Sequence, residues 1–359
     1  MIPLWKVRRE LSRFKSQLLA IAEHPLQGWK TRRHDNARPQ NLKTANGDLT
    51  LGTSVAVILI FQPKGIAQST LDMLAWFKSY DITPLVVSNC PIPQEDIDAI
   101  KPLCWKVIER PNFGYDFGGY REGLMQLWEA KSSLNEVFVL NDSAWFPLDI
   151  ESDFIPRLRA TKADISGSIL REKQPNLRWL ESYFYRINGE TFRHSDFRSY
   201  WDEYLLTSNK YVVIRRGERD FGVTMIERGF SLSAIFDATS LVERLKKAPA
   251  TEIFKTLKYA HYVNIKWDME NASLLNTFAE DEAWKNEAIE HIQRSMEKVC
   301  FNSQFGYAAA NILGFPFLKK SNDPTNKGWR KEFRNAVEND DLPKPQPEIW
   351  RELAEKQDT

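Results

Sequence analysis

The 359-residue sequence has only three cysteines, Cys90, Cys104 and Cys300, and none of them forms a Cys-x-x-Cys pair. A disulfide framework and a cysteine zinc site are therefore excluded, and a reducing compartment is favoured. The five histidines are not paired at metal-ligand spacing either. His194 lies near Asp196, but no nucleophile with a recognisable elbow accompanies it, so triad hydrolase chemistry has no support.

Long hydrophobic runs and a large net charge are also missing. The longest clean apolar run, Val55–Phe61, is far too short to span a bilayer. Residues 1–28 contain basic residues but no sustained apolar segment followed by a cleavage site, so no signal peptide is expected. The formal net charge of +1 gives no field that would attract nucleic acid. We expect a cytoplasmic protein, with peripheral contact at the inner face of the plasma membrane left open.

Aromatic residues, by contrast, are abundant. They make up 12% of the chain, with twelve tryptophans, within a hydrophobic content of 42% that is ample for a core. Flat rings of this kind suit sugar-binding clefts, because they stack on the apolar face of a pyranose. The alternative for any single ring is an ordinary place in the core.

Between Ser54 and Leu140 the pattern alternates between strand and helix. The predicted strands are 55–61, 84–88, 105–109 and 137–140, and the predicted helices are 66–80, 94–103 and 120–130. This alternation predicts an α/β fold with a mostly parallel sheet and helices on both faces. Right-handed crossovers would bring the strand ends to one rim. The polar residues expected on that rim are Gln62, Ser88, Asn89, Asn112 and Asp142.

The stretch from Arg110 to Pro147 is the most informative. A glycine loop with Gly114, Gly118 and Gly119 precedes the predicted helix, and the strand after that helix stops at Asn141-Asp142-Ser143. Glycines allow a close backbone approach to a ligand. A carboxylate just beyond a strand's carboxyl end lies where open α/β sheets bind ligands. The stretch therefore predicts a ligand crevice with an acidic residue at its floor.

Several motifs occur together in a fixed order. They are Asn112-Phe113-Gly114-Tyr115-Asp116-Phe117-Gly118-Gly119-Tyr120, Val139-Leu140-Asn141-Asp142-Ser143, Ser182-Tyr183-Phe184, Glu218 followed by Gly229-Phe230, and Gly314-Phe315-Pro316-Phe317-Leu318-Lys319. In these motifs, over roughly residues 54 to 320, the chain resembles the rhamnan synthesis protein F family of bacterial polysaccharide glycosyltransferases. The resemblance implies a GT-A-like nucleotide-sugar-binding fold and sugar transfer in the synthesis of a surface polysaccharide.

Four segments are expected. Residues 1–50 form a basic amphipathic helix and a linker, with ten basic and four acidic residues. Residues 51–240 form the GT-A-like domain, 241–330 its helical C-terminal part, and 331–359 a polar tail. The first segment would either dock on an anionic membrane leaflet or pack on the main domain.

The resemblance also implies site residues. Asp142 is the candidate at the donor diphosphate, through Mg²⁺ or Mn²⁺. Enzymes of the GT-A type usually carry an Asp-x-Asp motif, whereas Asn141-Asp142-Ser143 has a single carboxylate, so metal dependence stays open and a turn-capping role is the alternative. The candidate substrate-binding residues are Asn89, Asn112, Gly114, Asp116, Gly118, Gly119, Arg121, Asn141, Ser143 and Lys319. Arg121 would bind the diphosphate or pair with Asp116.

Glu218 is the candidate general base, expected after a strand at 211–214, and Asp220 is its nearby substitute. The predicted function is inverting transfer of a sugar, rhamnose or another deoxyhexose, from a nucleotide-diphosphate donor to a lipopolysaccharide or cell-surface polysaccharide acceptor, glycan or lipid-linked. The alternative is a non-catalytic nucleotide-sugar-binding or membrane-surface assembly protein. The Asp-Phe-Gly triplets at 116 and 220 are not kinase marks, because the other kinase motifs are missing.

Overall fold

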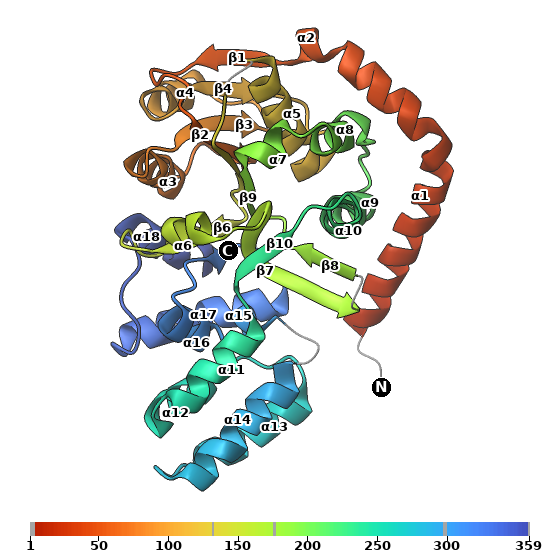
Figure 1. Ribbon diagram of the computed structural model, residues 1–359. Coiled ribbons are helices and arrows are strands. Elements are labelled where there is room, and N and C mark those ends of the chain that lie inside the picture. Colours follow the sequence, from red (N-terminus) through yellow and green to blue (C-terminus); the bar gives the residue numbers. More distant parts are fainter. Residues whose placement is uncertain (1–3, 131–132, 175–176, 297–299, 358–359) are drawn as a thin grey trace. The chain divides into compact units, whose positions relative to one another are not determined.

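The computed structural model describes residues 4–130, 133–174, 177–296 and 300–357 (Figure 1). The chain forms two compact units. Unit 1 comprises Met1–Asp142 and Pro156–Ile235, and unit 2 comprises Ser143–Ile155 and Phe236–Thr359. Within the described ranges, no helix combines the length and apolar character needed to cross a membrane.

Unit 1 is built on a sheet whose four central strands are parallel. In spatial order these are β4 (Lys106–Glu109), β3 (Thr83–Ser88), β2 (Ser54–Ile60) and β5 (Glu136–Asn141). Counted along the chain from β2, this is the order 3-2-1-4 of a doubly wound nucleotide-binding sheet. The predicted α/β class with a mostly parallel sheet is therefore confirmed.

The remaining strands extend the sheet at both edges. They are β1 (Lys43–Asn46), antiparallel to β4, then β9 (Phe184–Asn188), antiparallel to β5, and β7 (Ile165–Gln174), antiparallel to β9, with β8 (Leu177–Leu180) and β10 (Leu232–Phe236) beside β7. Residues 35–50, expected to be a linker, thus include a strand of the sheet. The composition of this segment indicated a turn, but the free edge of β4 offers the backbone hydrogen-bond partners that make it a strand.

Helices cover both faces of the parallel strands because both faces of β2 are apolar. On one face, Val57 and Leu59 lie so close to α5 (Tyr115–Glu129) that a Cβ added to Gly123 or Gly119 would clash with them. On the other face, α3 (Gln68–Ser79) places the ring of Phe77 near those of Phe138 and Phe184.

The other helices of unit 1 follow the sheet connections. They are α1 (Leu4–Asn36), α2 (Arg38–Asn41), α4 (Gln94–Ile100), the 3₁₀ turn Lys101–Leu103, α7 (Gly189–Arg193), α8 (Ser195–Glu203), α9 (Lys210–Ile214), the π-helical turn Arg215–Asp220 and α10 (Phe221–Glu227). Helix α6 (Phe154–Ala160) contains residues of both units. The expected strand at 211–214 is wrong, because Asn209 caps α9 by accepting a hydrogen bond from the Tyr211 N–H, and the run continues helically to α10.

Unit 2 is mostly helical. Its elements are β6 (Ala144–Trp145), α11 (Ala238–Lys247), α12 (Ala250–Lys258), α13 (Ile265–Asn276), α14 (Glu282–Met296), α15 (Phe301–Gln304), α16 (Gly306–Leu313), β11 (Leu318–Lys319), α17 (Pro324–Glu338) and α18 (Pro347–Gln357). The expected polar tail is wrong. Phe333, Ile349 and Leu353 are buried in one cluster with Trp145 and Leu318, so α17 and α18 belong to the core of this unit. Residues 241–330 also belong to unit 2 and not to the sheet domain.

Candidate active site at the carboxyl ends of the parallel strands

The carboxyl ends of β2 and β5 form the topological switch point of the sheet, where open α/β folds bind their ligands. Asp142 follows β5 directly, and its N–H donates to the Leu59 carbonyl at 3.1 Å. Its Oδ2 accepts hydrogen bonds from the Phe61 N–H and the Gln62 Nε2, both at 2.9 Å. Gln62 is itself fixed by the start of α3, because its Oε1 accepts from the Ala67 N–H at 2.7 Å. The Asp142 carboxylate is therefore held at the switch point by the chain that leaves β2.

The first turn of α5 supplies a second carboxylate. Gly114 caps this helix with a φ of 88°, a left-handed conformation that glycine adopts without strain. Asp116 lies in the first turn, and its Oδ2 accepts from the Asn141 Nδ2 at 3.1 Å. Asn141 is the last residue of β5, so this bond joins the amino end of α5 to the switch point. A helix amino terminus stabilises negative charge.

A buried arginine shapes the loop before α5. Arg110 Nη1 donates to the Asn89 Oδ1, and Nη2 donates to the Phe113 carbonyl, both at 2.5 Å. The Asn89 Nδ2 donates in turn to the Tyr115 carbonyl at 3.1 Å. Burial lowers the pKa of Arg110 to about 10. Asn89 therefore holds the loop, because its amide oxygen and nitrogen both bond to the protein.

The third carboxylate, Glu218, reaches the same region from the π-helical turn. The Ser182 Oγ donates to the Glu218 Oε1 at 2.5 Å, and the Ser182 carbonyl accepts from the Tyr120 hydroxyl at 2.8 Å. A Cβ on Gly217 would lie 2.2 Å from the Phe117 ring, so the turn rests directly on α5. Single π-helical turns within helices occur frequently at functional sites.

The electrostatics of Tyr120 link the three carboxylates. Burial raises the pKa of the Tyr120 hydroxyl well above its usual value. Nearby anionic groups raise this pKa further, among them the carboxylates of Asp116, Glu218 and Asp142. All three are only partly buried. Hydrogen bonds connect these carboxylates to the same part of unit 1, Asp116 through Asn141, Glu218 through Ser182, and Asp142 through the chain that leaves β2.

Not every predicted site residue is placed to bind a ligand near these carboxylates. Gly118 and Gly119 lie inside α5, where a Cβ would clash with the Phe113 carbonyl and the Leu59 side chain, so they serve helix packing. The expected pairing of Arg121 with Asp116 is wrong. Arg121 is 5% exposed and donates to Asp35 at 2.6 Å and to the Trp201 carbonyl at 2.7 Å, and these bonds leave it no path to a diphosphate.

The remaining predicted residues are more loosely placed. Asn112 and Asp220 are exposed, Asn112 in the loop before α5 and Asp220 at the end of the π-helical turn. Ser143 and Lys319 belong to unit 2, where the Ser143 carbonyl accepts from the Lys320 N–H at 2.8 Å. Ser88 is fully buried and donates to the Cys90 carbonyl, so it does not line the rim.

Two residues with a place in the site were not assigned a role from sequence. Ser182 holds Glu218, and its only signal was its position in the Ser182-Tyr183-Phe184 motif. Phe61 directly follows β2, and its side chain is 52% exposed although its N–H is bonded to Asp142. The signal available in the sequence was an aromatic residue at the end of the first predicted parallel strand.

A metal ion would find few protein ligands here. The described residues contain no group of three or more His, Cys, Asp or Glu side chains that could hold one. Mg²⁺, however, is commonly bound through one or two carboxylates together with substrate phosphates. Asp142 fits that second arrangement, in which the donor itself supplies most of the ligands.

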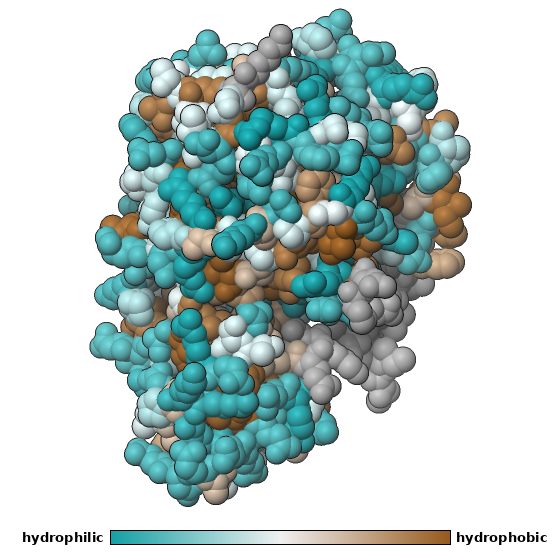
Figure 2. All heavy atoms as spheres, in the orientation of Figure 1, coloured by the Kyte–Doolittle hydropathy of each residue, from teal (hydrophilic) through white to brown (hydrophobic). Residues whose placement is uncertain are grey.

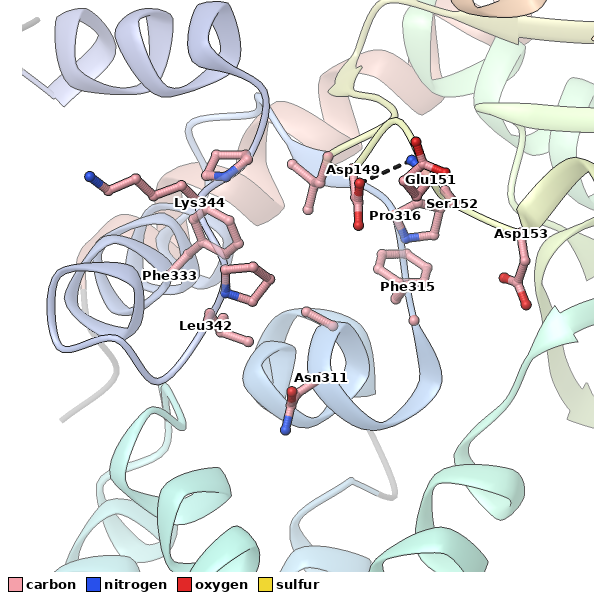
Figure 3. Close-up of a pocket in the computed structure, with 15 residues that line it drawn as sticks. Asp149, Glu151, Ser152, Asp153, Asn311, Phe315, Pro316, Phe333, Leu342 and Lys344 are labelled. Carbon is pink, nitrogen blue, oxygen red and sulfur yellow. Dashed lines mark hydrogen bonds between the residues drawn. The ribbon is translucent and has the colours of Figure 1, made fainter. Parts of the chain in front are cut away.

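Unit 2 contains a separate cavity of about 490 Å³ (Figure 3). Apolar side chains line it, including Phe315, Pro316 and Leu342, and the acidic loop with Asp149, Glu151 and Asp153 lies at its rim. Within that loop the Asp149 Oδ1 accepts from the Glu151 N–H at 3.0 Å. The Asp149 carboxylate thus takes part in folding its own turn.

Unit 1 therefore has a doubly wound sheet with partly buried carboxylates near its switch point, where nucleotide-binding α/β proteins hold their ligands. A model of the family described as rhamnan synthesis protein F matches residues 85–266, half of the chain, and the chain belongs to this family. That family was predicted from the sequence motifs. Membership supports a glycosyltransferase that acts in polysaccharide synthesis.

Individual proteins are more distantly similar. The chain is 29% identical over 261 residues to the uncharacterized protein y4gN of Sinorhizobium fredii, covering 72% of this chain and 68% of that protein. Among solved structures, the mannosyltransferase PcManGT from Pyrobaculum calidifontis, in complex with GDP-Man and Mn²⁺, is 10% identical with a TM-score of 0.28, covering 90% of this chain and 97% of that one. The mannosyltransferase Ktr4p from S. cerevisiae is 10% identical with a TM-score of 0.25, covering 49% and 64%. Likenesses of this size say nothing about donor or acceptor.

Proposed function

We propose that the protein is an inverting glycosyltransferase with a GT-A-like fold, which moves a sugar from a nucleotide-diphosphate donor to a glycan acceptor. One observation carries the proposal. Asp142, Asp116 and Glu218 come from three different segments, and hydrogen bonds with Phe61, Asn141 and Ser182 hold them near the end of β5. Family membership supports the same reaction class.

The donor would lie across the ends of β2 and β5. The amino end of α5 favours the negative diphosphate, and Asp116 would bind sugar or ribose hydroxyls, with Asn112 and the backbone at Gly114 beside it. The exposed ring of Phe61 offers a face on which the nucleobase can stack. Asp142 would hold a Mg²⁺ or Mn²⁺, whose chemistry is to neutralise charge on the departing diphosphate.

Glu218 would act on the acceptor. Inverting transfer requires a base that takes the proton from the acceptor hydroxyl as it attacks the anomeric carbon. The Ser182 hydroxyl donates to one Glu218 oxygen at 2.5 Å and so fixes the carboxylate in one orientation. Asp220, two residues further on and exposed, is the substitute base.

The finer identity follows the family name. Rhamnose or another deoxyhexose is the proposed sugar, and a lipopolysaccharide or other cell-surface polysaccharide, free or lipid-linked, is the proposed acceptor. The proposed location is the cytoplasm, peripheral to the inner face of the plasma membrane.

A thermal-shift screen of nucleotide sugars with and without Mn²⁺ tests the proposal, because a ligand that binds only the native state raises the melting temperature. We expect one donor to stabilise the protein and to be turned over when acceptor is added. Turnover that is the same in wild type and in an Asp142→Asn, Glu218→Gln double variant would contradict the assigned site.

A second candidate is a non-catalytic nucleotide-sugar-binding protein. The single carboxylate of Asn141-Asp142-Ser143 favours it. Stabilisation by a donor without hydrolysis or transfer, in the presence of a range of acceptors, would identify this second function.

A further inference from the structure

Helix α1 packs on unit 1 through its polar side. Gln27 and Thr31 are buried, and they accept hydrogen bonds from the Arg216 Nη2 at 2.9 Å and from the Leu206 N–H at 2.9 Å. Asp35 accepts the Arg121 pair described above, and Glu23 accepts from the Thr207 hydroxyl at 2.7 Å. The described contacts of this inner face are therefore made largely by amide, hydroxyl and carboxylate groups, with one ring contact between His34 and Phe113.

The outer face of the same helix is apolar. Phe14, Leu18, Ile21 and Trp29 recur at three-, four- and eight-residue steps, which places them on one side, and they are 52–72% exposed. Leu19 and Leu26 flank this stripe and are also exposed. Figure 2 shows hydrophobic residues along the margin of the molecule where α1 runs in Figure 1. We call this surface the α1 stripe.

This arrangement is the reverse of ordinary helix packing, in which the apolar side faces the core. Scattered exposed apolar residues need no explanation, but a contiguous stripe on one helix marks an interaction surface. The residues of the stripe are not members of the buried clusters formed by the described residues. The stripe therefore fits an apolar partner.

The charges on the outer side are positive. Arg32 and Arg33 are exposed at the end of the stripe, where Arg33 lies over the Trp29 ring. Within residues 14–36 the only carboxylates are Glu23 and Asp35, and both are paired with cations, Glu23 with Lys30 at 2.8 Å. Apolar side chains flanked by arginines are the composition of helices that lie in a membrane interface.

We propose that the α1 stripe docks on the surface of an anionic lipid bilayer, with the helix lying in the interface and not spanning it. Apolar side chains would enter the acyl boundary while Arg32 and Arg33 meet lipid phosphates. A groove of about 540 Å³ runs from Trp29 and Arg33 to Phe113, in the loop before α5. The docked helix thus holds the candidate active site close to the membrane. That last consequence rests on the proposed function, whereas docking itself does not.

Co-sedimentation of the full chain with vesicles tests the docking. The vesicles are phosphatidylcholine alone, or phosphatidylcholine with about one third phosphatidylglycerol. We expect the wild type to bind the anionic vesicles and to be released by salt, since charges near a membrane surface are screened. Removing both cations in R32Q/R33Q should weaken binding about 30-fold, at about 1 kcal/mol for each basic residue near the surface.

The apolar contribution has a matched control. L18Q/I21Q removes two residues of the stripe and should weaken binding at least about tenfold, since each is largely exposed in the free protein and would be buried on docking. I265Q/M269Q changes two equally exposed residues on α13 and should bind like wild type. Because all four side chains are exposed, each variant should keep the wild-type melting temperature, which a thermal melt checks.

Three outcomes would overturn the proposal. In the first, the wild type stays in the supernatant with anionic vesicles. In the second, the L18Q/I21Q variant binds as well as the wild type. In the third, the wild type forms a dimer without lipid, and among the variants only L18Q/I21Q is monomeric. The last would make the stripe an interface between two copies. None of these measurements uses donor or acceptor, so failure of docking is distinguishable from failure of the transferase assignment.

Discussion

Replacing Glu218 by Gln keeps the shape of the side chain and removes its charge. The Ser182 hydroxyl, 2.5 Å from Oε1, can still donate to the amide oxygen. A hydrogen bond to a charged acceptor contributes about 1.5–3 kcal/mol and a neutral one about 0.5–1.5, so the variant should lose only about 1 kcal/mol of stability. Its fold and its donor site should survive.

The rate of sugar transfer, in contrast, should fall sharply. A general base contributes about 10²- to 10⁴-fold and acts on the acceptor's proton alone. Glu218→Gln should therefore bind donor with near wild-type affinity and transfer sugar at least about 100-fold more slowly. Donor affinity is measured by thermal shift, and transfer is measured separately by release of the nucleoside diphosphate at saturating donor and acceptor.

A second variant, Ser182→Ala, tests the role of the hydrogen bond to Glu218. It keeps the Glu218 carboxylate but removes the hydrogen bond that fixes its Oε1, so the base is less well positioned. Transfer should therefore slow, but by less than in Glu218→Gln, while donor affinity stays near wild type. A loss of donor affinity or of melting temperature in proportion to the loss of rate would instead give Ser182 a purely structural role.

Normal turnover in Glu218→Gln would refute the reasoning. Asp220 would then be the first residue to replace, because it lies in the same π-helical turn. Loss of donor binding in Glu218→Gln would also refute it, since the carboxylate would then belong to the donor site.

Further predictions concern the donor site and its frame. Asp142→Asn keeps an oxygen for the two N–H donors but loses the charge, so the variant should melt within a few degrees of wild type. It should lose the Mn²⁺-dependent stabilisation that the donor gives the wild type. Unchanged donor affinity with and without metal would show that Asp142 only caps a turn. Gly217→Ala places a methyl 2.2 Å from the buried Phe117 ring, so it should cost about 1–3 kcal/mol in thermal unfolding and lower turnover, and a wild-type melt would show that the turn can shift. Asp35→Asn leaves the buried Arg121 without its counter-ion. It should cost about 2 kcal/mol, below the 3–5 typical of a broken buried pair because the arginine keeps its backbone partners, and an unchanged melt would show that α1 does not stabilise unit 1.

The parallel half of the sheet follows from the sequence alone. Each central strand is a short run of β-branched and apolar residues followed by polar ones, and burial on both faces accepts only such runs. Because the apolar run of β5 stops at Asn141, the sequence also places Asp142 at the end of that strand and so at the switch point. The motif around Asn112–Tyr120 likewise indicates the family from the order of its residues, without any knowledge of how they pack.

Tertiary structure decided the conformation of those segments for which the sequence pattern is ambiguous. Tyr211–Ile214 has the composition of a strand, but the Asn209 cap and the continuous run into α10 make it helical. The glycines at 118 and 119 indicate a loop, yet both lie inside α5, where a Cβ on Gly118 would clash with the Phe113 carbonyl and one on Gly119 with Leu59 of β2. Arg121 found its partner in Asp35, 86 residues away, which no local spacing could indicate.

The same holds for α1. Its sequence showed an amphipathic helix with a basic character, and left open which side faces the protein. Amphipathic periodicity gives the direction of an apolar face only relative to the helix itself. The buried Gln27 and Thr31 turn that face outward, because their partners on Arg216 and Leu206 exist only once the chain is folded.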